Sequence, residues 1–545
     1  MLGKILKTLF LTGVVFQGSY AQNTDLYKSD VWVADQGDGT YKNPILHADY
    51  SDPDVVRVGN DYYMTASSFN CAPGLPVLHS KDMVNWELIN YALREQIPVD
   101  HFKIPQHGNG VWAPSIRYHN NEIYIYWGDP DFGIYMVKTK DPFGKWDEPV
   151  LVMEAKGAID PSPLWDDNGK AYLVHAWAGS RAGVKSLLTV HEMNSEGTKI
   201  LDKGKHVFDG HDANPTVEGA KFYKRNGYYY IFAPAGGVAT GWQLVLRSKD
   251  IFGPYEEKVV LEQGSTKING PHQGAWVETP AGVSWFYHFQ DVDAYGRIVH
   301  LQPMSWKNNW PVMGEDYDGN GVGEPVTKHK KPIVGETYPM VSPIETDEFS
   351  TDKLGLQWQW QANPNVLWSV QLRNTDYLRL FCRKVPEGSR NLWMVPNLLL
   401  QKFPANNFSA TTKVKLFPEE AISGKSSGLI IMGMDYATLT IASDKDGFFI
   451  AQTEALEAIN GNDEKIITKA RIKSNQIYFK VTVRTPDATC RFSYSESGKK
   501  FKQIGKPFKA QPGKWIGAKV GLFSISTQKA KRGGYADFDW FRISE

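Results

Sequence analysis

The sequence is poor in cysteine and has no excess of charge of either sign. Its 545 residues include three cysteines, Cys71, Cys382 and Cys490, which lie far apart. This excludes a disulfide framework and a zinc motif; we expect buried free thiols, with a Cys382–Cys490 bond as the alternative. Lys plus Arg and Asp plus Glu both number 60, so the protein has no net positive charge that would attract nucleic acid.

Long hydrophobic runs are also lacking, apart from one short run near the N-terminus. Residues 1–21 combine two lysines, an apolar run and small residues ending at Ala21, which is typical of a cleaved signal peptide. The run is too short for a permanent transmembrane helix, so we expect no membrane insertion. The predicted protein is exported and soluble, and periplasmic if its source has two membranes. The sequence leaves the oligomeric state open.

Aromatic residues, glycine and proline are abundant. Aromatics make up 13% of the chain, with 18 Trp, and there are 49 Gly and 31 Pro. This composition suits all-β folds. Flat aromatic rings also stack on sugar rings, although most of these Trp are expected to be core. The length exceeds one ordinary core and predicts two domains, or three.

A turn followed by an aromatic-rich strand occurs five times, at intervals of about 50 to 60 residues. The five turns begin at Gly59, Asn120, Asn168, Asn226 and Ala281. Three copies are followed by Ser/Thr-Lys-Asp and an aromatic residue, beginning at Ser80, Thr139 and Ser248. Each copy fits a β-hairpin, and five such units predict a five-bladed β-propeller. The alternative is a large sandwich with accidentally similar hairpins.

Upstream of each hairpin, by about ten to thirteen residues, lies one position of the same repeat. These positions hold Asp52, Ala113, Asp160, Glu218 and His272. Because the innermost strand of every propeller blade lines the axis, equivalent positions converge on one point. The repeat therefore predicts three carboxylates and a histidine at the mouth of one funnel.

Three carboxylates around one pocket favour glycoside hydrolysis. One activates water as a base, a second protonates the leaving oxygen, and a third raises the pKa of the acid. Metal ligation is an alternative, and Asp52-Pro53 or Asp160-Pro161 alone would favour a structural turn. Their equivalent placement in the repeat favours catalysis. We expect Asp54 to brace the turn through backbone N–H groups.

From Asn43 onward the sequence resembles glycoside hydrolase family 43. The resemblance is carried by six motifs in order: Asn43-Pro44-Ile45-Leu46 with Ser51-Asp52-Pro53-Asp54, Gly110-Val111-Trp112-Ala113-Pro114, Ile159-Asp160-Pro161-Ser162, Val217-Glu218-Gly219, Gly270-Pro271-His272-Gln273-Gly274, and Gly296-Arg297. It implies a five-bladed propeller and single-displacement, inverting hydrolysis. The family's base matches Asp52, its pKa-tuning residue Asp160 and its acid Glu218. The family usually has a small hydroxyl residue where Asp54 stands.

The same resemblance implies substrate-binding positions. Phe69 and Trp112 match aromatic walls of the terminal-sugar subsite, with core packing as the alternative. Arg297 matches an arginine that contacts sugar hydroxyls, with a structural ion pair as the alternative. His272 matches a histidine near a water or calcium ion on the axis, and a hydrogen-bonded buried histidine is equally expected.

Residues 336–545 contain a series of strand patterns with alternating side chains, which is typical of a β-sandwich. They resemble the concanavalin-like domain of family xylosidases and arabinofuranosidases. The resemblance implies a loop over the pocket, hence an exo-acting site, and a calcium ion held by Glu348 and Asp539, with surface acids as the alternative. The predicted organisation is a signal peptide (1–21), an extension (22–42), an all-β propeller (43–335) and the sandwich (336–545).

The predicted activity is removal of terminal α-L-arabinofuranosyl residues from the side chains of plant polysaccharides, without a cofactor. A β-xylosidase, or a bifunctional enzyme, is the alternative. An endo-acting enzyme with an open groove, or a carbohydrate-binding propeller without catalysis, is the rival.

Overall fold

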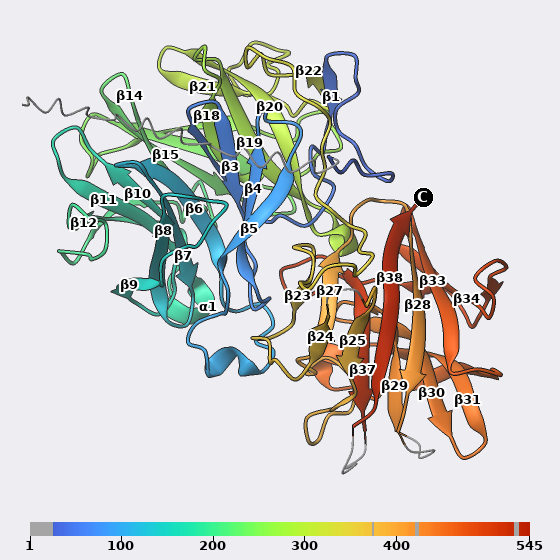
Figure 1. Cartoon of the computed structure of the whole chain (residues 1–545). Helices are drawn as coiled ribbons and strands as arrows, with labels where there is room; N and C mark the ends of the chain where they lie inside the picture. Colours follow the sequence, from blue (N-terminus) through green and yellow to red (C-terminus); the bar gives the residue numbers. More distant parts are fainter. Residues whose placement is uncertain (1–25, 373–374, 420–423, 528–532) are drawn as a thin grey trace, which may run out of the picture.

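The structure is a computed structural model that describes residues 26–372, 375–419, 424–527 and 533–545. The predicted signal peptide lies outside the described residues. Figure 1 shows two β-rich bodies, a propeller and a sandwich, packed beside each other. Within the described ranges, no helix has the length and apolar character needed to cross a membrane.

The first body is a five-bladed β-propeller. The described residues contain five antiparallel four-stranded sheets, each made of four consecutive strands. Blade one has β2 (Asp54–Val58), β3 (Asp61–Thr65), β4 (Gly74–Ser80) and β5 (Glu87–Leu93); blade two has β6 (Trp112–His119), β7 (Glu122–Asp129), β8 (Gly133–Thr139) and β9 (Val150–Glu154). Blade three has β10 (Ala158–Trp165), β11 (Ala171–Trp177), β12 (Leu187–Met193) and β13 (Lys205–Asp209); blade four has β14 (Lys221–Arg225), β15 (Tyr228–Ala235), β16 (Trp242–Ser248) and β17 (Glu256–Leu261). Blade five has β18 (His272–Glu278), β19 (Ser284–Asp291), β20 (Arg297–Lys307) and β21 (Trp310–Met313).

The repeated turns are the hairpins between the first and second strands of the blades. Asn120 and Asn121 have φ of 49° and 62°, and Asn226 and Gly227 have φ of 50° and 70°. Tight two-residue hairpins need positive φ at both positions, which Asn and Gly adopt most readily. The positions of these turns can therefore be predicted from the Asn-Asn and Asn-Gly pairs in the sequence.

The ring is closed by backbone contacts between the two ends of the propeller. β1 (Thr40–Lys42), inside the predicted N-terminal extension, pairs with β22 (Lys328–Lys330). The Asn43 amide donates to the carbonyls of Leu301 (2.9 Å) and Val326 (2.7 Å) and accepts from Leu301 N–H (2.9 Å). The Asn-Pro-Ile-Leu motif thus joins the start of the propeller to β20.

The second body is a sandwich of two eight-stranded sheets in the described residues. One sheet runs β23 (Gln359–Trp360), β27 (Leu398–Lys402), β37 (Lys519–Ser526), β29 (Lys425–Met432), β30 (Tyr436–Asp444), β31 (Gly447–Ala455) and β32 (Lys465–Arg471), with β26 (Arg383–Lys384) beside β37. The other runs β24 (Ser369–Gln371), β25 (Leu378–Phe381), β38 (Tyr535–Ser544), β28 (Phe408–Phe417), β33 (Gln476–Arg484), β34 (Thr489–Ser495) and β35 (Lys502–Gln503), with β36 (Phe508–Lys509) beside β34. Alternate residues of strands such as β28 and β33 are buried, as expected where each sheet has one face in a core. Short helical turns are η1 (His101–Lys103), α1 (Gly179–Ala182), η2 (Asp293–Tyr295) and η3 (Ala458–Asn460).

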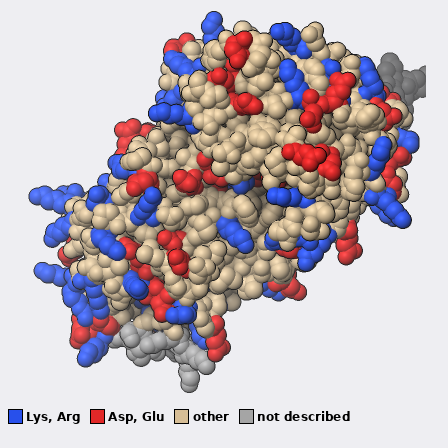
Figure 2. All heavy atoms as spheres, turned by 180° about the vertical axis from the view of Figure 1, so that it is seen from behind, with Lys and Arg blue, Asp and Glu red and all other residues tan. Residues whose placement is uncertain are grey.

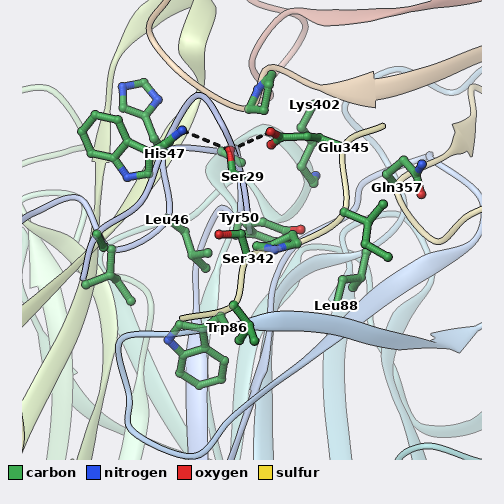
Figure 3. A pocket seen from close by; sticks show the side chains of 18 of the residues that line it. Ser29, Leu46, His47, Tyr50, Trp86, Leu88, Ser342, Glu345, Gln357 and Lys402 are labelled. Carbon is green, nitrogen blue, oxygen red and sulfur yellow. Dashed lines mark hydrogen bonds between the residues drawn. The ribbon is translucent and has the colours of Figure 1, made fainter. Parts of the chain in front are cut away.

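The two bodies are joined by direct hydrogen bonds. Ala72 of blade one and Trp360 of β23 exchange backbone bonds of 3.0 and 2.7 Å. Figure 3 shows a cavity between the two bodies, where Ser29 donates to Glu345 at 2.6 Å and Lys402 of β27 lies in the wall. Burial raises the pKa of Glu345 to about 7. The sandwich is therefore held against the propeller by polar as well as apolar contacts.

The surface and the cysteines agree with the composition. On the face in Figure 2, basic and acidic side chains are interspersed, with no large area of one sign. All three cysteines are buried and free, as expected. Cys382 and Cys490 lie in the hydrophobic core of the sandwich.

Candidate active site

One cavity opens at the propeller axis and contains every predicted catalytic residue. Its lining is Asp52, Phe69, Trp112, Ala113, Ile159, Asp160, Thr216, Glu218, Gly237, Val238, His272, Gln273, Arg297 and Trp515. The cavity volume is about 240 Å³. The convergence predicted from the repeat is therefore present.

Bulges at the axial ends of the innermost strands aim side chains into this cavity. Pairing is interrupted after Trp112 in β6, after Ile159 in β10 and after His272 in β18. Within these interruptions, Asp160 has φ of 56° and Gln273 has φ of 36°. A β-bulge redirects a side chain and frequently marks an active site. The sequence repeat located the positions but gave no sign of the bulges.

Asp52 is buried and surrounded by donors. Its Oδ2 accepts hydrogen bonds from the hydroxyls of Ser51 (2.6 Å) and Ser67 (2.5 Å). Its Oδ1 lies 3.4 Å from Nη1 of Arg297, which also donates to Ser51 at 2.9 Å. An ionised carboxylate is an acceptor only, so this set of donors fits that form. Ser67, far from the motif in sequence, was not predicted.

Asp160 lies beneath the cavity with only 2% of its surface exposed. Its Oδ2 accepts the backbone N–H of Gly219 at 2.6 Å and lies 3.4 Å from Nε2 of Gln273. Burial, and next the charge of Glu218, raise the pKa of Asp160 to about 8. Two interacting carboxyls of this kind hold a proton between them near neutral pH.

Glu218 is the more accessible member of this pair. Its side chain keeps 34% of its surface exposed, and its Oε1 lies 3.2 Å from Nε2 of His272. His272 is fully buried, and its Nδ1 has no hydrogen-bond partner among the described residues. The histidine therefore orients Glu218 from beneath the cavity.

Aromatic rings from both bodies form the wall of the cavity. The ring centroids of Phe69 and Trp112 are 6.5 Å apart, and those of Trp112 and Trp515 are 6.3 Å apart. The indole N–H of Trp112 donates to the carbonyl of Gly108 at 2.9 Å. Trp515 belongs to the sandwich, so this domain contributes to the pocket as expected, but the residue itself was not predicted. The signal was there: Gly513-Lys514-Trp515-Ile516-Gly517 places a tryptophan in a glycine-flanked loop.

The chain matches two family models. Residues 41–311 match the model described as Glycosyl hydrolases family 43, and residues 346–544 match the Beta xylosidase C-terminal Concanavalin A-like domain. The chain belongs to glycosyl hydrolase family 43. It is therefore a glycosidase of that family, built as a propeller with a concanavalin-like domain.

Three family relatives cover most of the chain. The "Putative beta-xylosidase" of Xylanibacter ruminicola is 42% identical over 91% of this chain and 88% of its own length. The "Beta-xylosidase" of Formosa agariphila is 34% identical over 93% and 90%. A "Non-reducing end alpha-L-arabinofuranosidase" of Bacteroides ovatus is 29% identical over 73% and 74%.

Beneath the cavity, a buried ion pair and a buried lysine link the blades. Asp54 accepts from the N–H of Ile116 at 2.8 Å and from Arg117 at 2.6 Å, both on β6 of blade two. It therefore bridges two blades and does not brace its own turn, because the neighbouring strand supplies the donors. Lys221 is fully buried and donates to the carbonyl of Pro114 at 2.9 Å. Neither basic residue was predicted, since each is isolated in the sequence.

The two predicted calcium ligands of the sandwich are each paired with a cation. Glu348 binds Arg542 through two hydrogen bonds of 2.7 and 2.8 Å, and Asp539 pairs with Lys413. Across the described ranges, no group of three or more His, Cys, Asp or Glu is arranged to hold a metal ion. Glu348 and Asp539 are ion-pair partners in this structure, and calcium binding by them stays a prediction.

Proposed function

We propose that this family 43 enzyme is an exo-acting, inverting β-xylosidase that removes terminal xylosyl residues from plant polysaccharide fragments. The observation that carries the proposal is one cavity lined by Asp52, Asp160 and Glu218 and flanked on the sandwich side by Trp515. A pocket with a wall from a second domain favours a chain end over a continuous polymer. The substrate is a carbohydrate, as the family implies.

In the proposed reaction, Asp52 accepts a proton from water as the water oxygen attacks the anomeric carbon. Glu218 gives its proton to the glycosidic oxygen as that bond breaks. Asp52 ends protonated and Glu218 ionised, and exchange with solvent restores both. Arg297 and the two serine hydroxyls hold Asp52 in place. Asp160 keeps a proton available to Glu218, because its own burial and the charge of Glu218 disfavour ionisation of Asp160 at neutral pH.

The choice of xylose reverses the preference drawn from sequence. The two relatives named as β-xylosidases match more of this chain, at higher identity, than the one named as an arabinofuranosidase. The residues of the cavity supplied no reason to prefer arabinofuranose. α-L-Arabinofuranosidase activity is the second candidate, supported by the Bacteroides ovatus relative.

The decisive experiment compares 4-nitrophenyl β-D-xylopyranoside with 4-nitrophenyl α-L-arabinofuranoside. We expect kcat/KM to be at least about tenfold higher for the xyloside, a difference of about 1.4 kcal/mol in transition-state binding. The first sugar released should be α-xylose by proton NMR, and xylo-oligosaccharides should yield only xylose. A preference for the arabinofuranoside would support the second candidate, and release from neither would favour a binding module.

A further inference from the structure

A buried carboxylate joins the sandwich to the propeller beside the proposed active site. Asp49 is 3% exposed and lies three residues before Asp52. Its Oδ1 accepts the backbone N–H of Arg297 at 2.9 Å, and its Oδ2 accepts the backbone N–H of Gly517 at 3.0 Å. Arg297 belongs to blade five and Gly517 to the sandwich. One side chain, that of Asp49, thus holds the two bodies together at this point.

The same place contains a close backbone approach of the two bodies. A Cβ on Gly517 would lie 2.8 Å from the Cα of Gly296. Next to it, the N–H of Ala518 donates to the carbonyl of Ala294 at 2.8 Å. No side chain larger than hydrogen fits at Gly517 without displacing the propeller backbone. The base of the loop 511–517, between β36 and β37, is therefore anchored on the turn that precedes Arg297.

The tip of this loop reaches the sugar pocket. Trp515 lies two residues before Gly517, is 51% exposed and packs edge-on against Trp112. The side chain of Lys514 and the ring of Trp515 both lie beside Gly108, which leaves no space there for a Cβ. The anchored Gly517 is thus only two residues along the chain from Trp515 in the pocket wall.

A lysine of the sandwich interacts electrostatically with Asp49. Lys402 of β27 lies over the ring of Tyr50, 5.1 Å from its centroid, in the cavity drawn in Figure 3. Burial lowers the pKa of Lys402 to about 8, and the negative charge of Asp49 opposes this shift. A buried carboxylate is costly unless it is hydrogen-bonded and paired. Asp49 receives one N–H group from each body, Arg297 from blade five and Gly517 from the sandwich, and Lys402 adds a favourable charge.

We propose that Asp49 is a positioning residue that fixes loop 511–517 on blade five, so that Trp515 forms a wall of the sugar pocket. This inference rests on the proposed function for its kinetic consequence, but the anchoring itself is independent of it. Without the anchor, the base of the loop loses an acceptor for Gly517, and Trp515 is no longer held against Trp112.

Asp49→Asn tests the proposal with the smallest change. An amide has one acceptor oxygen, so either Arg297 or Gly517 loses its partner and faces an NH2 group. We expect trypsin to cleave the folded protein after Lys514 roughly tenfold faster, because loss of a charge-assisted hydrogen bond frees the loop. KM for the aryl xyloside should rise roughly tenfold with kcat within about threefold, since the wall is disturbed while Asp52 keeps its hydrogen bonds from Ser51 and Ser67.

A double-mutant cycle with Trp515→Ala identifies the route of the effect. If Asp49 acts through Trp515, Asp49→Asn should raise KM less than about twofold in the Trp515→Ala background. Asp293→Asn changes an exposed carboxylate in the same blade-five turn and serves as the matched control. It should leave both cleavage and KM at wild-type values.

Two results would overturn the proposal: wild-type cleavage after Lys514 in Asp49→Asn, or full additivity in the cycle. If the wild-type protein hydrolyses neither aryl pentoside, the proposed function fails. The cleavage comparison then still decides whether Asp49 anchors the loop.

Discussion

The backbone N–H of Gly219 donates a 2.6 Å hydrogen bond to Oδ2 of Asp160. Gly219 directly follows Glu218, so this bond fixes the buried carboxyl relative to the residue proposed as the acid. Burial and the neighbouring charge of Glu218 raise the pKa of Asp160 to about 8. The pair therefore retains a proton in the pH range where an isolated pair of carboxylates would have none.

Asp160 should make the protein less stable as pH rises. Its folded pKa is above the unfolded value of about 4, so the folded state holds an extra proton between about pH 4 and 8. Stability from this group is complete at the acidic end and is lost toward pH 8. Asp160→Asn should remove this dependence, so thermal midpoints of variant and wild type should diverge in the variant's favour from pH 5 to 8. A constant difference would contradict the raised pKa.

Glu218→Ala should separate substrates by their leaving groups. We expect loss of about 10²–10⁴-fold in kcat/KM on xylobiose, which needs protonation of a poor leaving group. The loss on 4-nitrophenyl xyloside should be much smaller, because nitrophenolate leaves without a proton. Steady-state rates on both substrates give the ratio. Equal losses on the two would remove Glu218 from the role of acid.

Lys221 should lower the pH at which activity falls on the alkaline side. Its ammonium lowers the pKa of Asp160, although burial has the larger effect on that pKa and raises it. Lys221→Met removes the positive charge, so the alkaline limb of kcat/KM should move up by about 0.5–1 pH unit. Lys224→Met, which breaks an ion pair with Asp166 away from the cavity, is the matched control. An unchanged or lowered limb would show that Lys221 acts only structurally.

Trp515→Ala should weaken sugar binding with little effect on stability. The side chain is half-exposed, so its removal should change the free energy of unfolding by less than about 0.5 kcal/mol. KM for the aryl xyloside should rise on the order of tenfold, because an aromatic wall of the pocket is lost. Tyr317→Ala, at an exposed aromatic residue outside the cavity, should leave KM unchanged. A destabilised Trp515→Ala with normal KM would assign Trp515 to domain packing.

Asn43→Ala should open the closure of the propeller. The amide loses the hydrogen bonds that it donates to the carbonyls of Leu301 and Val326 and the one that it accepts from Leu301 N–H, while the Leu301 carbonyl keeps the Tyr41 hydroxyl as a donor. We expect a loss of about 2–4 kcal/mol in the free energy of unfolding. Urea titration followed by tryptophan fluorescence would measure it, and kcat should be nearly unchanged below the transition. A midpoint equal to wild type would mean that the strand pairing alone closes the ring.

Local chemistry explains what could be predicted. The Asn-Asn and Asn-Gly turns specify hairpins because only certain residues adopt positive φ, and their regular spacing specifies blades. Asp52, Asp160 and Glu218 could be grouped because equivalent positions of a propeller meet on its axis. Ser67 and Lys221 could not, because a serine in a loop and a lysine in a strand are ordinary residues until their neighbours are known. The family resemblance did not separate arabinofuranose from xylose.

The sequence by itself determined the blades, the sandwich and the carboxylates of the cavity, because a repeat carries its own geometry. The tertiary structure alone decided which atoms hold those carboxylates. Arg297 of blade five meets Ser51 and Asp52 of blade one only through the closure of the ring, and Ser67 reaches Asp52 through the pairing of β2 with β3. It also decided that Asp49 receives N–H groups from both domains and that Trp515 reaches the pocket. Contacts between chain segments hundreds of residues apart depend on how two rigid bodies pack, and no local pattern encodes that packing.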